Sequence, residues 1–489
     1  MTPRALRLAF PLPLAAAAAV TGMLTGLVAA RVWPDPTLPT FALVVACGLV
    51  VLRWPIVGIG LFVGIAALLP FAVLPVRLVF APTLVDIVLG LVLIAWVIRL
   101  LGTDEPLAVS VIHVLLGLFA IACLISLILG NAIVPVSFAD TRLFLKLLTG
   151  MLLFVGAVQI IRRSEQVDLV LRVFVLVGTT AAILALAVYA LPRETAVEVL
   201  SQLGILGYPT GSEVVRTVAG TETVRANGSS VDPNVLGALL MLAGLVVLGQ
   251  IVASRPLFPR WILVLAAAVI LCALALTYSR SAWVGLAAGF AYLALTRERR
   301  LLVLGAAGIG GLLLLPQTQA FVARFAAGLE LRDEATLMRL DEYRNALALI
   351  AQYPVFGIGF GDSPSIEIGA GVSSLYLLIA EQAGLVGLTL FLALIVVLSV
   401  FGLTAAVPHD DSLWGSLASL QAALVGALVA GLFDHYFFNL RFPHMVALFW
   451  LLAALLWITA TLARHRENPL APHETAAAPI LSAGPAPAS

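Results

Sequence analysis

The chain has 489 residues, of which 62% are hydrophobic and only 11% are charged. A soluble globular domain carries roughly 25% charged residues, so this apolar excess needs the lipid bilayer as its solvent. The formal net charge of +1 excludes a global field that would attract nucleic acid. The composition therefore predicts an all-α, polytopic bundle of transmembrane helices, with the bilayer as a partner and no nucleic acid.

A spanning helix needs about 20 mostly apolar residues. Segments of this kind lie at 14–30, 38–53, 55–70, 83–101, 107–130, 140–161, 167–191, 232–253, 260–278, 281–297, 300–316, 384–404, 413–433 and 444–462. The length rule thus predicts about 12–14 spans, the lower number applying if the short second, third and tenth segments do not cross the bilayer.

Arginines in the short loops predict the orientation of these spans. With a cytoplasmic N-terminus, the inside loops contain Arg53, Arg99, Arg162, Arg163, Arg255, Arg260, Arg297, Arg299, Arg300, Arg464 and Arg466. The positive-inside rule favours this arrangement over its reverse. It places two long polar connections, 192–231 and 317–372, on the outer side of the membrane. We expect residues 1–466 to form one membrane domain and the Ala- and Pro-rich 467–489 to be a disordered cytoplasmic tail.

The second long connection is predicted to be partly helical. From Leu337 onward, apolar residues recur at three- and four-residue spacing, namely Leu340, Tyr343, Leu347 and Ile350. This spacing indicates an amphipathic helix lying against the membrane face or the bundle. Pro354 and the glycines that follow it should end the helix, because small residues allow sharp turns and close backbone approach.

The turn Thr277-Tyr278-Ser279-Arg280 between two spans carries the most informative arginine. A guanidinium at this depth is costly unless it is paired or binds an anion. The alternative is that Arg280 extends to the lipid headgroups, as many arginines at helix ends do.

Two further stretches gather polar groups at the same side of the membrane. Arg225 precedes a helix start in which Asp232 can cap the helix and Asn234 follows, although an ordinary helix start would look the same. Asp434, His435 and Arg441 lie between the last two spans, where a histidine near a carboxylate is a candidate general base. The alternative there is an interfacial aromatic belt with an Asp–Arg pair.

These stretches, in this order, resemble the O-antigen ligase / O-antigen polymerase superfamily of bacterial envelope glycosyltransferases. The resemblance covers roughly residues 220–460. It rests on Asp232–Asn234, Thr277–Arg280, Arg339 through Tyr343 to Pro354–Gly359, and Ser373–Leu377 with Glu381 and Gly384–Leu388. Each motif is weak alone, and the ordered set is fairly specific.

The resemblance implies an enzyme of the inner membrane that acts at the periplasmic face. Such proteins move a glycan from an undecaprenyl-diphosphate carrier to lipid A–core in ligases, or to another lipid-linked glycan in polymerases. They are thought to need neither a metal nor a nucleotide sugar. Arg280 and Arg339 match the family's arginines and would stabilise the diphosphate leaving group. We expect further substrate contacts from Arg225, Asp232, Asn234, Tyr343, Arg344, Ser373, Ser374 and Arg441.

The sequence departs from the family at the expected base. Ligases resembling this chain carry a His-Asn pair where this sequence has Ser373 and Ser374, and serine is not a base at neutral pH unaided. His435 is one candidate replacement, and Asp434, Asp362 and Glu367 are the others. The departure leaves a polymerase or a related exopolysaccharide role open beside the ligase, and it also leaves a non-catalytic assembly scaffold open. A transporter or flippase of envelope polysaccharide is a separate alternative.

Overall fold

The computed structural model describes residues 37–74, 81–102, 109–218, 221–303, 305, 334–361 and 372–467. Within these ranges the regular elements are all helices. The only β-type pairings there are two isolated bridges, Val73–Thr83 and Thr217–Val224. The all-α fold is therefore confirmed. The predicted tail after Glu467 lies outside the described residues, as do the predicted span 14–30 and most of 300–316.

The helices of the amino-terminal half are α2 (Thr37–Arg53), α3 (Pro55–Leu68), α4 (Leu84–Gly102), α5 (Val111–Gly130), α6 (Phe138–Ile160), α7 (Ser164–Tyr189), α8 (Arg193–Ser201) and the short η1 (Gln202–Leu206), η2 (Ser212–Val214) and η3 (Gly228–Ser230). The carboxyl half contains α9 (Pro233–Val252), α10 (Arg260–Leu276), α11 (Arg280–Thr296), α14 (Glu334–Gln352), α15 (Leu375–Leu403), α16 (Ser412–Ala430) and α17 (Pro443–Glu467).

Eight of the described helices are long and apolar enough to cross a bilayer, and α2, α3 and α10 are shorter apolar helices. Each predicted span that falls within the described residues coincides with one helix. The clearest difference is at 384–404, because α15 begins already at Leu375 and continues through a kink.

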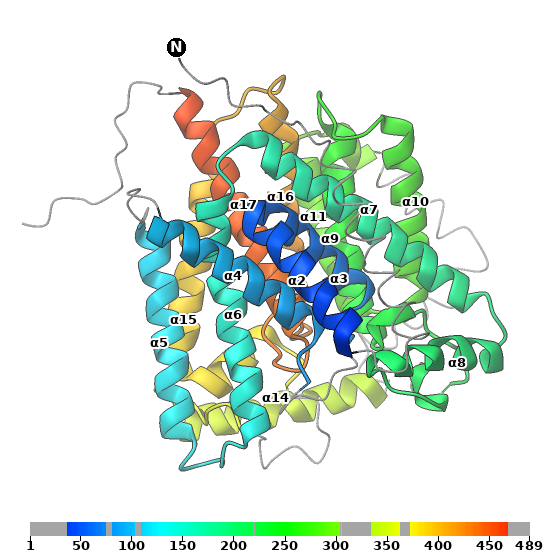
Figure 1. Cartoon of the computed structure of the whole chain (residues 1–489), viewed down its shortest axis with the longest axis vertical. Coiled ribbons are helices and arrows are strands. Elements are labelled where there is room, and N and C mark those ends of the chain that lie inside the picture. The colour runs from blue at the N-terminus through cyan, green and yellow to red at the C-terminus, as the bar shows by residue number, and fades with distance from the viewer. Residues whose placement is uncertain are drawn as a thin grey trace, which may run out of the picture.

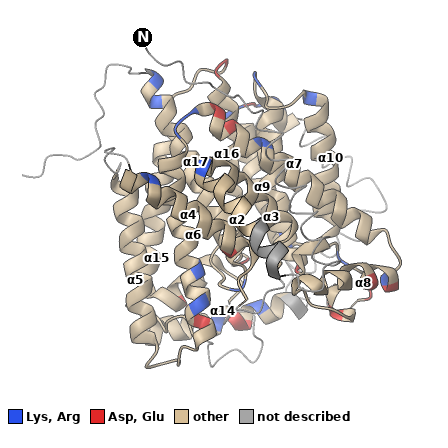
Figure 2. Ribbon diagram, in the orientation of Figure 1, with Lys and Arg blue, Asp and Glu red and all other residues tan. Residues whose placement is uncertain are grey.

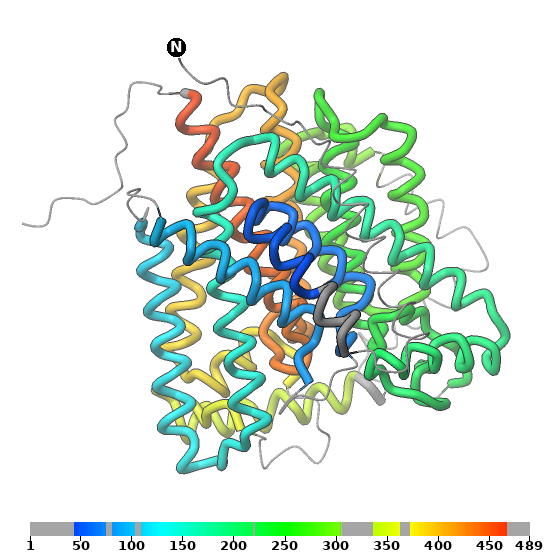
Figure 3. The backbone as a smooth tube through the Cα atoms, viewed as in Figure 1, coloured from blue at the N-terminus to red at the C-terminus, as the bar shows by residue number. Residues whose placement is uncertain are grey.

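The long connections lie at one end of the bundle, which we call the outer end (Figure 1). There α8 packs beside the bundle, and α14 runs across the helices rather than along them. The tube through the Cα atoms shows the spans crossing back and forth between this end and the opposite one (Figure 3). Charged residues gather mainly toward the two ends, with an uncharged band between them (Figure 2). This distribution is the one a bilayer requires.

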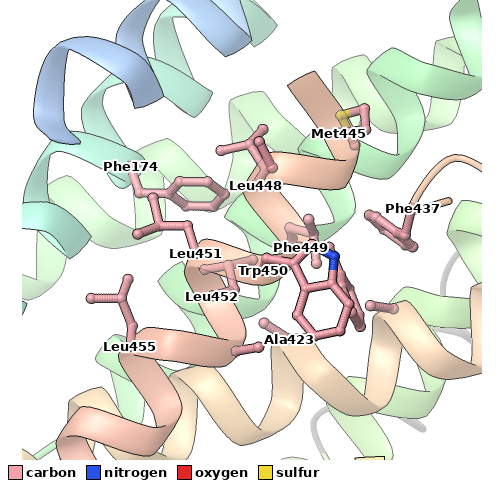
Figure 4. Packing of buried hydrophobic residues seen from close by; sticks show 14 of the residues in the cluster. Phe174, Ala423, Phe437, Met445, Leu448, Phe449, Trp450, Leu451, Leu452 and Leu455 are labelled. Atoms are coloured by element: carbon pink, nitrogen blue, oxygen red, sulfur yellow. The ribbon is translucent and has the colours of Figure 1, made fainter. Parts of the chain in front are cut away.

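The centre of the bundle is built from α9, α16 and α17. In the apolar stretches of these three helices, 83%, 83% and 89% of the residues are buried inside the protein, against 33% in α4, α5 and α15. Figure 4 shows α17 residues from Met445 to Leu455 packed against Phe174 of α7 and Ala423 of α16. The outer helices instead expose large apolar side chains such as Leu101 and Ile128, which indicates a lipid-facing surface.

A kink in α15 places its first two turns at the outer end. Gly384 interrupts the helix with φ 70° and ψ −177°, which an L side chain rarely adopts. The glycine-rich turn after α14 packs onto the opened backbone, because Ile358 N donates to Glu381 O at 2.9 Å and Leu385 N to Pro354 O at 2.8 Å. A Cβ on Gly384 would lie 2.1 Å from Val355 O, so this close approach requires glycine.

Candidate functional site

The turn between α10 and α11 brings four polar residues to the outer end. Tyr278 has φ 54°, a conformation uncommon for a residue other than glycine, and it reverses the chain sharply. Ser279 N donates to Thr277 Oγ1 at 3.2 Å, which closes the turn. Arg280 follows as the first residue of α11 and is half-buried.

A buried hydroxyl network joins this turn to the connection between α16 and α17. Ser281 Oγ lies 2.6 Å from Tyr436 Oη and donates to Asp434 Oδ2 at 3.3 Å. Ser279 Oγ lies 3.3 Å from the same phenol oxygen. Burial, with the neighbouring Asp434 carboxylate, raises the pKa of Tyr436 well above its ordinary value. The phenol therefore remains protonated and serves as a hydrogen-bond donor within the network.

Arg339 brings α14 into this network. Its Nη2 lies 3.6 Å from Asp434 Oδ2, and the two side chains are 26% and 6% exposed. Burial acts to lower the pKa of Arg339, but the charge of Asp434, aided by nearby tyrosines and Glu342, outweighs it and raises the pKa. Arg339 and Asp434 are thus held as an ion pair where water has limited access.

The face of α14 that is turned to the bundle combines the polar side chains of Arg339, Glu342 and Tyr343 with apolar ones such as the buried Ala346. Glu342 Oε2 accepts a hydrogen bond from Ser373 N at 2.9 Å, and Tyr343 Oη donates to Ser373 O at 2.8 Å. Tyr343 is half-buried, as the apolar spacing indicates, whereas Leu337 and Leu347 are exposed. The stripe of apolar residues therefore predicts only part of the buried face, because Arg339 and Glu342 occupy the rest.

His435 lies against the start of α15. Its Nδ1 is 2.9 Å from Val372 O, and a carbonyl can only accept, so Nδ1 carries the proton. The neutral ring then has its lone pair on Nε2. His435 N also donates to Asp434 Oδ1 at 2.9 Å, which fixes the two residues relative to each other. The imidazole of His435 thus lies beside Ser373 and Ser374, although His435 is about 60 residues further along the chain.

The two serines themselves have local structural roles. Ser374 caps α15 by accepting a hydrogen bond from Leu377 N, and it is buried. Ser373 contacts α14 through its backbone groups. Both therefore position the first turn of α15 next to His435.

Arg225 joins the stretch ahead of α9 to the same turn. Its Nε donates to Thr277 O at 2.7 Å, and its Nη2 donates to Asn234 Oδ1 at 2.5 Å. Asp232 caps α9 by accepting from Asn234 N at 2.7 Å, as predicted. Arg225 also lines a cavity of about 340 Å³ between the outer end of α7 and α8, together with Arg193 and several apolar side chains.

Two of the predicted contact residues lie outside this network. Arg344 is exposed and pairs with Asp341 at 3.0 Å on the solvent side of α14. Arg441 is also exposed. The alternative bases Asp362 and Glu367 lie outside the described residues.

Sequence reasoning did not single out Ser279, Ser281, Tyr436 or Glu342 as site residues. A usable signal is the spacing of the two serines on either side of Arg280, since it places both hydroxyls at the start of one helix. The partners of these hydroxyls lie more than 150 residues away, so only the fold identifies them. Within the described ranges, no group of three or more His, Cys, Asp or Glu side chains could hold a metal ion.

The fold and this site define a multi-pass membrane protein with a polar, arginine-containing site at one end of its spans. Residues 265–392 match the family described as O-antigen ligase, and this match supports placing the chain in the O-antigen ligase-like superfamily. The matched residues include the α10–α11 turn, α14 and the kinked start of α15. A comparison with curated proteins finds no match. The O-antigen ligase family acts in glycan transfer during polysaccharide assembly.

Proposed function

We propose that this protein transfers a glycan, at the periplasmic face of the bacterial inner membrane, from a polyprenyl-diphosphate-linked donor to a lipid-linked or lipid A–core acceptor. The observation that carries the proposal is the contact between Arg339 and Asp434, because it unites the long outer helix with the Ser281 turn and His435. One diphosphate could contact both Arg339 and Arg280 from this side of the bundle.

The arginines at this site can stabilise a diphosphate leaving group. As the bond between the anomeric carbon and the diphosphate oxygen breaks, the oxygen keeps the bonding pair and negative charge grows on the carrier. Arginine binds such groups bidentately, and preorganised donors stabilise the charge as it develops. Asp434 holds Arg339 in position, and Arg225 supports the turn that carries Arg280 by donating to Thr277 O.

His435 is the base in this proposal. The acceptor hydroxyl oxygen attacks the anomeric carbon and forms the new glycosidic bond, and its proton passes to Nε2 of His435. The Nδ1–H bond to Val372 O keeps the ring in the tautomer that this step needs. In this mechanism Ser373 and Ser374 only position the first turn of α15.

Replacement of the two arginines tests the proposal in cells. Arg280→Ala and Arg339→Ala should each abolish the glycan product while the protein still inserts into the membrane at normal levels. Arg300→Ala is a matched control, because Arg300 is exposed at the opposite end of the bundle and its ion-pair partner among the described residues is Glu298. Normal product in both site variants would refute the proposal.

A further inference from the structure

A second basic cluster lies on the outer half of α6, apart from the site described above. Arg142 and Lys146 are four residues apart and therefore share one face of the helix. Lys146 Nζ lies 2.7 Å from Asp86 Oδ2, with the two side chains 13% and 23% exposed. Asp86 is fixed in the first turn of α4 by reciprocal hydrogen bonds with Thr83. Asp86 thus pairs with Lys146, and Arg142 is a second cation on the same face of α6.

Arg142 has no counter-ion within the described part of the chain. The residue is half-buried, and its Nε is fully buried without a hydrogen-bond partner. A buried charged donor that lacks a partner is costly, and more so in an apolar surrounding. The excess positive charge on this face of α6 therefore favours binding of an anion.

His444, at the start of α17, adds a third polar group. It is 1% exposed, and its Nδ1 has no hydrogen-bond partner among the described residues. The two helices pack tightly here, since a Cβ on Gly150 would lie 3.3 Å from the Cα of Ala447. Lys146 and His444 each lie about one turn before this contact, so both belong to the same part of the α6–α17 interface.

An aromatic wall lies between this cluster and the site at Arg339. Phe144, on α6 between Arg142 and Lys146, meets Phe360 with ring centroids 4.8 Å apart. Phe360 in turn lies 6.2 Å from Phe438, three residues after His435. Phe144 is two residues from both Arg142 and Lys146 and therefore lies on the opposite face of α6 from them, and the packed rings run from that face to the segment that carries His435.

We propose that Arg142, Lys146 and His444 bind the phosphate of a second amphiphilic substrate, so that a lipid-linked acceptor is held on one side of the aromatic wall and the donor on the other. The naming of this ligand as the acceptor rests on the proposed function. Leu145, beside Arg142 on α6, is exposed in the apolar part of the bundle. A lipid chain can lie along that surface, which favours a lipid phosphate over free phosphate.

Direct binding of farnesyl phosphate to the purified full-length protein in neutral detergent tests this site. The measurement is made in an Arg339→Ala background, so that the donor site contributes little. Arg142→Gln leaves the Lys146–Asp86 pair intact and should weaken binding by about tenfold or more, as expected for loss of a charged hydrogen-bond donor. Arg142→Lys should restore most of the affinity. Arg162→Gln, at the other end of α6, should bind as its parent does.

Competition identifies the part of the ligand that is recognised. Farnesol and inorganic phosphate should each compete far more weakly than farnesyl phosphate. Equal competition by inorganic phosphate would overturn the lipid assignment, and equal competition by farnesol would overturn the anion site. Unchanged binding in folded Arg142→Gln would also overturn it. Because the readout is binding and not glycan transfer, this result is independent of whether the protein proves to be a transferase.

Discussion

Arg339 and Asp434 lie 3.6 Å apart although they are separated by 95 residues in the chain, and this pair holds α14 across the outer end of the bundle. Asp434 also accepts hydrogen bonds from Ser281 and from the backbone of His435. A single carboxylate thus connects three segments that the sequence separates widely.

Asp434→Asn should weaken the attachment of α14 and lower activity. The amide retains the shape of the carboxylate but not its charge, so half-buried Arg339 loses its ionic partner. We expect a loss of about 1.5–3 kcal/mol in stability, the range for a hydrogen bond to a charged group. Thermal unfolding monitored in detergent, together with glycan transfer, measures both effects. Asp341→Asn, which removes an exposed pair on the same helix, should change stability by less than about 0.5 kcal/mol.

His435→Asn separates a catalytic role from a structural one. The Asn amide nitrogen can replace Nδ1 as donor to Val372 O, but nothing replaces Nε2. Loss of a general base lowers a rate by about 100-fold or more. The turnover rate should therefore fall by that factor while the unfolding temperature stays close to that of the parent. Near-normal turnover in a folded His435→Asn protein would exclude His435 as the base.

Gly384→Ala should prevent correct docking of the turn after α14. The added Cβ would lie 2.1 Å from Val355 O, and the positive φ is strained for alanine. Backbone strain of this kind costs about 1–3 kcal/mol before the overlap is counted. Size-exclusion chromatography of the fluorescently tagged protein should show a reduced monodisperse peak. Gly64→Ala in α3 is the control, because an added Cβ there has no neighbour within 4 Å. Equal peaks for the two variants would contradict the described contact.

Asp411, at the opposite end of the bundle, should make a contribution to stability that depends on pH. Burial acts to raise its pKa, but hydrogen bonds from Leu413 N and Arg466 outweigh this and lower the pKa below its ordinary value. A group whose folded-state pKa is lowered contributes stability above its unfolded pKa and loses it as pH falls through the folded pKa.

Asp411→Asn should therefore lower the unfolding temperature at pH 7 and have a smaller effect under strongly acidic conditions. The change should stay below about 1 kcal/mol, because the Asp411–Arg466 pair is partly exposed and screened by water. Asp410→Asn is the control, since this neighbour accepts no hydrogen bond from the described residues. A loss that is the same at both pH values would show that charge is not responsible.

The spans could be predicted from the sequence because each requires a long apolar run, and α9, α16 and α17 follow these runs closely. The cap of α9 was also predictable, since Asp232 lies directly before Pro233 and a long apolar stretch. The kink at Gly384 was not, because a glycine within an apolar helix gives no sign that another backbone segment docks there. The family resemblance drew attention to Arg280 and Arg339. The pairing of Arg339 with Asp434, and the contacts of Asp434 and Tyr436 with Ser281, depend on tertiary contacts that local pattern does not encode.

The most direct test of the proposed function is a transfer assay with purified protein and a polyprenyl-diphosphate-linked oligosaccharide. Lipid A–core and a second molecule of the donor are offered as rival acceptors. The account predicts a glycan joined to one of them with release of one polyprenyl diphosphate per transfer, and no product with Arg339→Ala. Absence of product with both acceptors, while the same protein moves the intact donor across a liposome membrane, would contradict it.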